Sequence, residues 1–174
     1  MNEVMRQIKV SKVTLNMGVG GPGDKLEKAI KLLNQISNKK PVQTKAGPRA
    51  RIPTWGVRPN IPLGCKVTLR GKEAEELLKR LLVAVDNKLK GRKFDNFGNF
   101  SFGIEEYINI PNVKYDPAIG VIGLEVAVTL ERPGFRVKRR KLRNTKIGKN
   151  HLITKEEAIN FMIKNFDLKL GDEE

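Results

Sequence analysis

Residue types that build several common kinds of site are almost absent from this 174-residue chain. Cys65 is the only cysteine and His151 the only histidine, which excludes an intramolecular disulfide and a Cys/His zinc cluster. Aromatic residues make up 6% of the chain, so we expect a core of mostly valine, isoleucine and leucine. No run approaches the roughly 18 apolar residues of a membrane-spanning helix. Residues 1–6 also lack the apolar core of a signal peptide. These absences predict a soluble, cytoplasmic protein.

Acidic residues are missing from two long stretches of a chain whose formal net charge is +15. Residues 39–72, the first basic block, hold nine lysines and arginines and no acid. Residues 132–155, the second basic block, hold ten and again no acid. A solvated surface usually mixes both signs, so the blocks predict contacts with the phosphates of a nucleic acid. The candidate cations are Lys39, Lys40, Lys45, Lys66 and Arg70 in the first block and Arg136, Lys138, Arg139 and Arg140 in the second.

Hydrophobic periodicity predicts the secondary structure between and within these blocks. Alternating residues predict strands at 13–17, 65–70, 100–104 and 124–130, a short strand near Val42, and a strand at 107–110 after a bulge. Helical spacing predicts helices at 26–36 and 73–89, and Thr154-Lys-Glu-Glu157 is a capping box that opens a third helix. We therefore expect one domain, residues 1–174, with an α+β fold. Its mostly antiparallel sheet is covered on one face by helices.

Three predicted segments carry concentrated positive charge. The strand at 65–70 alternates an apolar face with a face that carries Lys66, Thr68 and Arg70. The loop 46–63 has four prolines and two glycines, and it carries Arg49, Arg51, Arg58 and the only tryptophan, Trp55. Long irregular loops in compact domains are typically functional or disordered. The third is the basic C-terminal segment 132–153.

A glycine-rich turn, Gly18-Val-Gly20-Gly-Pro-Gly23, fits the dinucleotide-binding pattern G-x-G-x-x-G between a strand and a helix. The acidic residue that this pattern needs about 20 positions later is missing, because that window reads Gln43-Thr44-Lys45. Pro22 also removes a backbone donor. We expect a tight turn in which Asp24 caps the following helix. Alternatively, the backbone of this turn approaches an RNA phosphate.

Other motifs favour structural roles. The run Phe94–Gly103 matches the aromatic strand of an RNA-recognition motif poorly, and core packing explains its phenylalanines better. Cys65 is expected to be a half-buried strand residue and His151 a loop or capping residue. The acids are scattered along helix faces without pairing, so we predict no enzyme, no metal site and no cofactor.

Five segments together resemble one known family, in the same order and with the same spacing. They are Val13–Gly20, Lys40–Ala46, Pro62–Gly71, Phe94–Ile104 and Tyr115-Asp116. The family is that of large-ribosomal-subunit protein five, which binds 5S rRNA in the central protuberance. The stretch from Arg132 to His151 resembles the archaeal and eukaryotic branch, since bacterial members typically lack this basic extension.

The resemblance implies a concave, basic sheet face that binds 5S rRNA through Asn16, Lys66 and Thr68. Lys39 stands where many bacterial members have glutamine, which implies a phosphate contact instead of a base contact. The loop 46–63 corresponds to one that reaches P-site tRNA, and the loop 113–123 to one that bridges to a small-subunit protein. The implied bridge residues are Val113, Lys114, Tyr115 and Asp116. Large-subunit rRNA and other 5S-binding ribosomal proteins are further implied partners.

Three other classes of function remain open from the residues alone. A free-standing RNA-binding or RNA-chaperone module would carry the same charges. A nucleotide-binding enzyme would rest on the glycine turn. A membrane-surface binder is disfavoured, because no predicted helix pairs a basic face with a large aromatic one.

Overall fold

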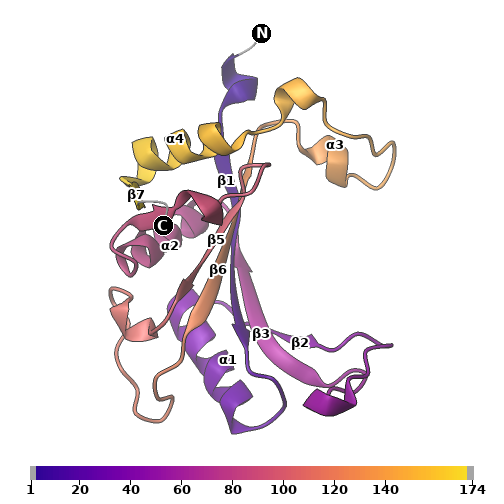
Figure 1. Cartoon of the computed structure of the whole chain (residues 1–174), viewed down its shortest axis with the longest axis vertical. Helices are drawn as coiled ribbons and strands as arrows, with labels where there is room; N and C mark the ends of the chain where they lie inside the picture. The colour runs from indigo at the N-terminus through magenta and orange to yellow at the C-terminus, as the bar shows by residue number, and fades with distance from the viewer. Residues whose placement is uncertain (1–2, 172–174) are drawn as a thin grey trace. The chain divides into compact units, whose positions relative to one another are not determined.

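The computed structural model describes residues 3–171, and their contacts form two compact units. Unit 1 contains residues up to 13, residues 70–102 and residues from 127 onward, and unit 2 contains residues 14–69 and 103–126. Three strands pass from one unit into the other: β1 (Lys9–Gly18), β5 (Phe100–Ile104) and β6 (Leu124–Glu131). Figure 1 labels these elements.

Within the described residues, five strands form one antiparallel sheet in the order β2-β3-β1-β6-β5. The edge strand β2 (Val42–Lys45) pairs with β3 (Pro62–Leu69), and Val42 lies opposite Lys66. A second, parallel sheet joins β4 (Lys88–Lys90) to β7 (Lys169–Gly171). The predicted α+β fold with a mostly antiparallel sheet is confirmed, whereas the small parallel sheet was not predicted.

In unit 2, helix α1 (Asp24–Ser37) packs on the apolar face of β3. The buried helix residues are Leu26, Ala29, Leu32, Leu33, Ile36 and Ser37. Asn38 ends the helix in a left-handed conformation, as expected for a residue at this position. The predicted cap was wrong, because Gly23 is the N-cap and Asp24 is the first helical residue. The negative charge of Asp24 still interacts favourably with the positive end of the helix dipole.

In unit 1, the main helices are α2 (Lys72–Val83) and α4 (Lys155–Phe166), and a short helix α3 (Arg136–Arg139) lies in the second basic block. The capping box of α4 is confirmed, since Thr154 and Glu157 exchange their two hydrogen bonds. Helix α2 ends earlier than predicted, because Asp86 and Asn87 adopt positive φ angles that a helix cannot contain. Five 3-10 helices complete the described chain: η1 (Glu3–Arg6), η2 (Pro53–Trp55), η3 (Gly91–Lys93), η4 (Tyr107–Asn109) and η5 (Lys149–His151).

Two further predictions about segments were wrong. The predicted strand at 107–110 is the 3-10 helix η4, because the fully buried Tyr107 turns inward and its hydroxyl accepts a hydrogen bond from the Asp116 N–H (3.1 Å). The predicted loop 46–63 is shorter, since Pro62 and Leu63 already belong to β3. Cys65 is fully buried instead of half-buried.

Candidate nucleic-acid interface

The face of the sheet in unit 2 that lies opposite the core carries several of the predicted RNA contacts. Lys66 and Thr68 are exposed on β3, while Cys65, Val67 and Leu69 point into the core. The Thr68 hydroxyl lies 3.3 Å from that of Thr14 on β1, which places both strands on one polar surface. The alternation predicted for β3 therefore separates a core face from a solvent face, as a sheet that binds RNA requires.

An acid from outside both basic blocks lies on this same surface. The side-chain amide of Asn16 donates a hydrogen bond to the carboxylate of Glu125 on β6 (3.1 Å). The surface is therefore mixed in charge rather than purely basic. Asn16 and Glu125 are 109 residues apart in sequence, so only the order of the strands could have revealed this pair.

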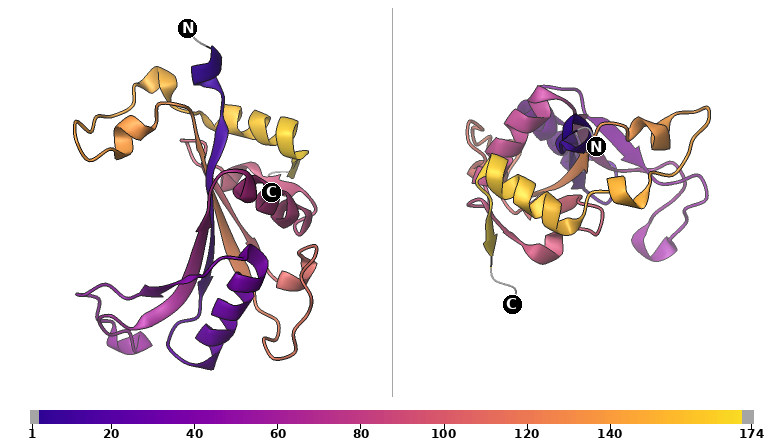
Figure 2. Two further views of the ribbon diagram at one scale, coloured as in Figure 1. Left: turned by 180° about the vertical axis from the view of Figure 1, so that it is seen from behind. Right: turned by 90° about the horizontal axis from the view of Figure 1, so that it is seen from above.

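The segment 46–61 is more regular than the sequence predicted, because backbone hydrogen bonds close it at both ends. At its base the Ala46 N–H donates to Ile61 (2.8 Å), and at its tip Ile52 and Val57 exchange two bonds of 3.0 Å. Trp55 at the tip is 75% exposed, and the side chains of Arg49, Arg51 and Arg58 are exposed around it. Figures 1 and 2 show this segment extending to the side of the sheet opposite α1. It therefore presents its cations on a preformed support.

The remaining cations of the first basic block are also exposed. Lys40 precedes β2, Lys45 is its last residue, and Arg70 directly follows β3. The Lys39 side chain is exposed too, and its backbone N–H donates to the Ser37 hydroxyl at the end of α1 (3.3 Å).

The second basic block divides into cations that the fold uses and cations that face solvent. The buried guanidinium of Arg132 donates to Glu157 (2.7 Å) and to the carbonyls of Leu152 (3.2 Å) and His151 (3.4 Å). Arg139 pairs with Glu131. Burial alone would raise the pKa of the Glu157 carboxyl, but the Thr154 backbone N–H and the Arg132 guanidinium outweigh that effect and lower it.

Arg136, Lys138 and Arg140 are exposed, and Arg140 is held by a bond from its Nε to the Arg143 carbonyl (2.7 Å). His151 is the last residue of the 3-10 helix η5, where a loop or capping residue was expected, and its Nε2 donates to the Pro133 carbonyl (2.8 Å). The block is therefore anchored by Arg132, and its cations between residues 136 and 149 are exposed.

The loop 113–123 is ordered around Asp116. Its carboxylate accepts the Ala118 N–H (2.9 Å), and its carbonyl accepts the N–H groups of Ile119 and Gly120. Lys114 and Tyr115 are exposed, whereas Val113 and Asp116 are half-buried. Among the four predicted bridge residues, Lys114 and Tyr115 are thus the most accessible.

The glycine turn cannot cradle a phosphate in the way that its sequence suggests. The N–H groups of Val19 and Gly20 both donate to the carbonyl of Leu63 (2.9 Å each). Two donors that a nucleotide-binding loop would direct at a ligand are therefore used within the fold. The turn joins β1 to α1 and ties it to β3.

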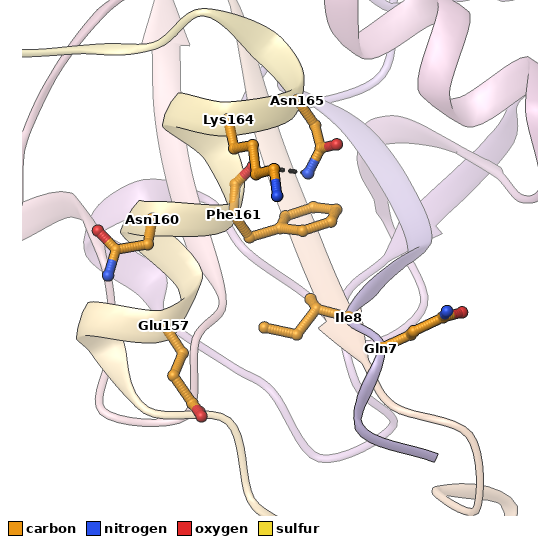
Figure 3. Close-up of a pocket in the computed structure, with 7 residues that line it drawn as sticks. All are labelled: Gln7, Ile8, Glu157, Asn160, Phe161, Lys164 and Asn165. Carbon is orange, nitrogen blue, oxygen red and sulfur yellow. Dashed lines mark hydrogen bonds between the residues drawn. The ribbon is translucent and has the colours of Figure 1, made fainter. Parts of the chain in front are cut away.

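No arrangement typical of catalysis is found among residues 3–171. They contain no group of three or more His, Cys, Asp or Glu side chains that could hold a metal ion. A pocket of about 590 Å³ in unit 1 lies between Gln7-Ile8 and α4, and Figure 3 shows Phe161 and Ile8 in it. Its one acid, Glu157, is the partner of Arg132. In the same described residues, no helix is long and apolar enough to cross a bilayer.

Two family models match the chain. The model described as "Ribosomal protein L5" matches residues 3–58, and the model that describes the C-terminus of the same ribosomal protein family matches residues 62–161. The chain belongs to the ribosomal protein L5 family. The boundary between the two matches falls at the base of the exposed basic segment 46–61, just before β3.

Curated relatives agree over almost the whole length. The chain is 53% identical to "Large ribosomal subunit protein uL5" of Nanoarchaeum equitans over 91% of this chain and 93% of the relative. Proteins with the same name from Nitrosopumilus maritimus and Sulfolobus acidocaldarius are 51% and 48% identical over 96% of this chain, and the matches cover 95% and 93% of them. These organisms are archaea, which agrees with the branch indicated by the segment 132–151.

Membership of the L5 family settles the class of protein. The chain is a structural, non-enzymatic component of the cytoplasmic ribosome, a ribonucleoprotein that works in translation. The prediction that it is not an enzyme is confirmed.

Proposed function

We propose that this chain, as one domain, binds 5S rRNA and helps to attach it in the central protuberance of the large ribosomal subunit. The observation that carries the proposal is the exposed polar face of unit 2, on which Lys66 and Thr68 lie beside Thr14 and Asn16. Lys39, Lys40, Lys45 and Arg70 extend the positive charge of this segment. Phosphate contacts from these cations would position the RNA, and Asn16 and Thr68 would contact sugars or base edges.

The carboxylate of Glu125 would orient the RNA on this face. A carboxylate repels phosphates but accepts hydrogen bonds from base amino groups. The phosphate backbone would therefore lie nearer Lys66, and a base or sugar nearer the Asn16–Glu125 pair.

The segment 46–61 would serve a second RNA, the P-site tRNA, through Arg49, Arg51, Trp55 and Arg58. Its hydrogen-bonded backbone supports this role, because a preformed loop loses less conformational entropy on binding. Lys114 and Tyr115, together with the half-buried Val113 and Asp116, would meet a small-subunit protein across the subunit interface. Arg136, Lys138, Arg139 and Arg140 would grip large-subunit rRNA, and other 5S-binding ribosomal proteins would lie nearby.

The salt dependence of 5S rRNA binding tests the sheet-face proposal. Each phosphate contact with duplex RNA contributes roughly 0.9 to the slope of log K against log salt, by analogy with DNA. The double variant Lys66→Gln/Arg70→Gln is expected to bind more weakly, with a slope shallower by about 1.8. The matched control Lys31→Gln/Lys79→Gln removes two exposed helix cations and should leave the slope unchanged.

Glu125→Gln provides a change of the opposite sign on the same face. Glutamine keeps one acceptor oxygen for a base or for Asn16, so removing only the negative charge should strengthen 5S rRNA binding, with little change in slope. If the Lys66/Arg70 variant keeps the wild-type salt slope while the Lys31/Lys79 variant has a shallower one, 5S rRNA binds to another surface of the protein. Neutralising Arg49, Arg51 and Arg58 should leave 5S affinity nearly intact and weaken P-site tRNA binding by reconstituted subunits.

A further inference from the structure

One exposed aromatic side chain in unit 1 has no role in the core. Phe94, Phe100 and Phe102 are buried, as the sequence predicted, but Phe97 is 59% exposed. Its backbone is fixed, because the Asp95 carboxylate accepts the N–H groups of Phe97 (2.9 Å) and Asn99 (2.7 Å). The Asn99 side-chain amide also donates to Asp95 (2.8 Å). The ring of Phe97 is therefore presented to solvent on a rigid turn.

Phe97 lines a pocket of about 480 Å³ whose other apolar lining includes Phe135 and Ile147 of the second basic block. This volume lies within the roughly 300–1,000 Å³ of typical small-molecule sites. Phe135 is supported by the ring of His151, 5.8 Å away between centroids, and the bond from His151 to Pro133 fixes that ring in turn. Several of the pocket's walls are thus supported before any ligand binds.

The charge around this pocket is strongly positive. Lys12, Lys138 and Lys146 line it, and no carboxylate among residues 3–171 forms an ion pair with any of them. Glu131 is the only acid among the described lining residues, and Arg139 pairs with it. The pocket therefore combines an aromatic wall with an unneutralised cationic rim. A fitting occupant has a flat apolar part and carries negative charge.

We propose that this pocket binds an unpaired nucleotide of a single-stranded rRNA segment. The base stacks on Phe97, and the neighbouring phosphates face Lys138 and Lys146. This inference rests on the proposed binding of rRNA by the second basic block, and it specifies what the block recognises. A duplex would use the cations but not the aromatic wall, since its bases are stacked inside the helix. Single strands use both, because every base offers a flat face and every linkage a phosphate.

The test uses the full-length chain and a fluorescein-labelled hexauridylate, with binding followed by anisotropy at several salt concentrations. Phe97→Ala is expected to weaken binding roughly five- to hundred-fold without changing the salt slope, since stacking involves no phosphate. Phe97→Leu, which keeps an apolar side chain, should weaken it as well. Leu142→Ala is the matched control, because Leu142 is 80% exposed in the same block and should not matter.

Two further measurements locate the RNA. Lys138→Gln/Lys146→Gln should lower the salt slope by about 1.4, at roughly 0.7 for each single-strand phosphate contact. A hexamer that carries 5-bromouridine should photo-cross-link to the peptide that contains Phe97. Circular dichroism melts show whether each variant is folded. If Phe97→Ala is unfolded, the affinity of Phe97→Leu and the cross-link test the proposal in its place.

The outcomes separate this inference from the proposed function. Wild-type affinity in the Phe97 variants, with a lower slope in the lysine variant, would refute base stacking and leave rRNA binding by the block intact. The pocket would then fit an acidic peptide better than a base. No binding of the hexamer by the wild-type chain would also refute the pocket proposal, while the 5S rRNA titration would judge the proposed function separately.

Discussion

The ion pair between Arg132 and Glu157 links the start of the second basic block to the first turn of α4. The Arg132 side chain is 5% exposed, whereas that of Glu157 is 42% exposed. Glu157 also accepts the Thr154 N–H in the capping box (3.0 Å). Replacing Glu157 by glutamine removes the negative charge and leaves one acceptor oxygen, which can keep the cap, whereas the side-chain NH2 group cannot accept the bond from Arg132.

The expected effect on stability follows from the kind of hydrogen bond that is lost. A hydrogen bond to a charged group contributes about 1.5–3 kcal/mol. Because Glu157 is partly solvated, water can replace some of the lost interaction, so the expected loss lies below the low end of this range. Glu157→Gln should therefore destabilise the protein by about 1 kcal/mol at neutral pH, which is about 2–4 °C in Tm for a domain of this size.

The pH dependence gives a sharper test than the magnitude. The pKa of Glu157 is lower in the folded protein than its ordinary value of 4.5. The stabilisation from its charge is therefore complete above about pH 4.5 and is lost as pH falls through the lower, folded pKa. The stability difference between wild type and Glu157→Gln should stay constant down to about pH 4.5 and then shrink toward zero as pH falls through the lower, folded pKa.

Urea unfolding of both proteins from about pH 7 to about pH 3 measures this difference. Glu156→Gln is the matched control, because Glu156 is exposed in the same helical turn and forms no side-chain bond with the described residues. A wild-type-minus-variant difference that does not change with pH would mean that the ion pair is absent in solution.

Two further predictions concern the core of unit 2. Burial raises the pKa of the Cys65 thiol to about 11. Native protein should therefore not react with a thiol reagent at pH 8, whereas unfolded protein should react fully. Rapid labelling of native protein would contradict the burial of Cys65. Gly64→Ala should destabilise the protein by more than about 2 kcal/mol in urea unfolding, because the added methyl group would overlap the Met17 carbonyl oxygen. Gly103→Ala, in β5 with open space around it, should cost under about 1 kcal/mol, and equal losses would show that the Met17 contact is not the cause.

Local patterns predicted much of the fold because the structure keeps to them. Strands β3, β5 and β6 alternate buried and exposed residues, and the capping box of α4 forms as its sequence indicates. Predictions failed where distant contacts decide the local conformation. Tyr107 leaves the strand pattern because its hydroxyl receives the Asp116 N–H, and β4 pairs with a strand about 80 residues later in the chain.

The candidate interface was predictable as a region but not residue by residue. The absence of acids from a stretch of sequence says nothing about acids that the fold brings to it. Glu125 reaches Asn16 across the sheet, and Glu157 reaches Arg132 from α4. Phe97 could not be identified as exposed from the sequence either. Three neighbouring phenylalanines are buried, and the sequence pattern does not distinguish Phe97 from them.

Counting basic residues therefore overstates the number of phosphates that a block can bind. Arg132 is buried and held by a carboxylate and two carbonyls, so releasing it for RNA would leave Glu157 and those carbonyls without their donor. Arg139 is paired but exposed, so a phosphate could compete with Glu131 for it at a smaller cost. Arg136 and Lys138 face no such competition from the described acids. The contribution of each cation to the salt slope of RNA binding should thus follow its freedom in the fold, with Arg132 contributing nothing.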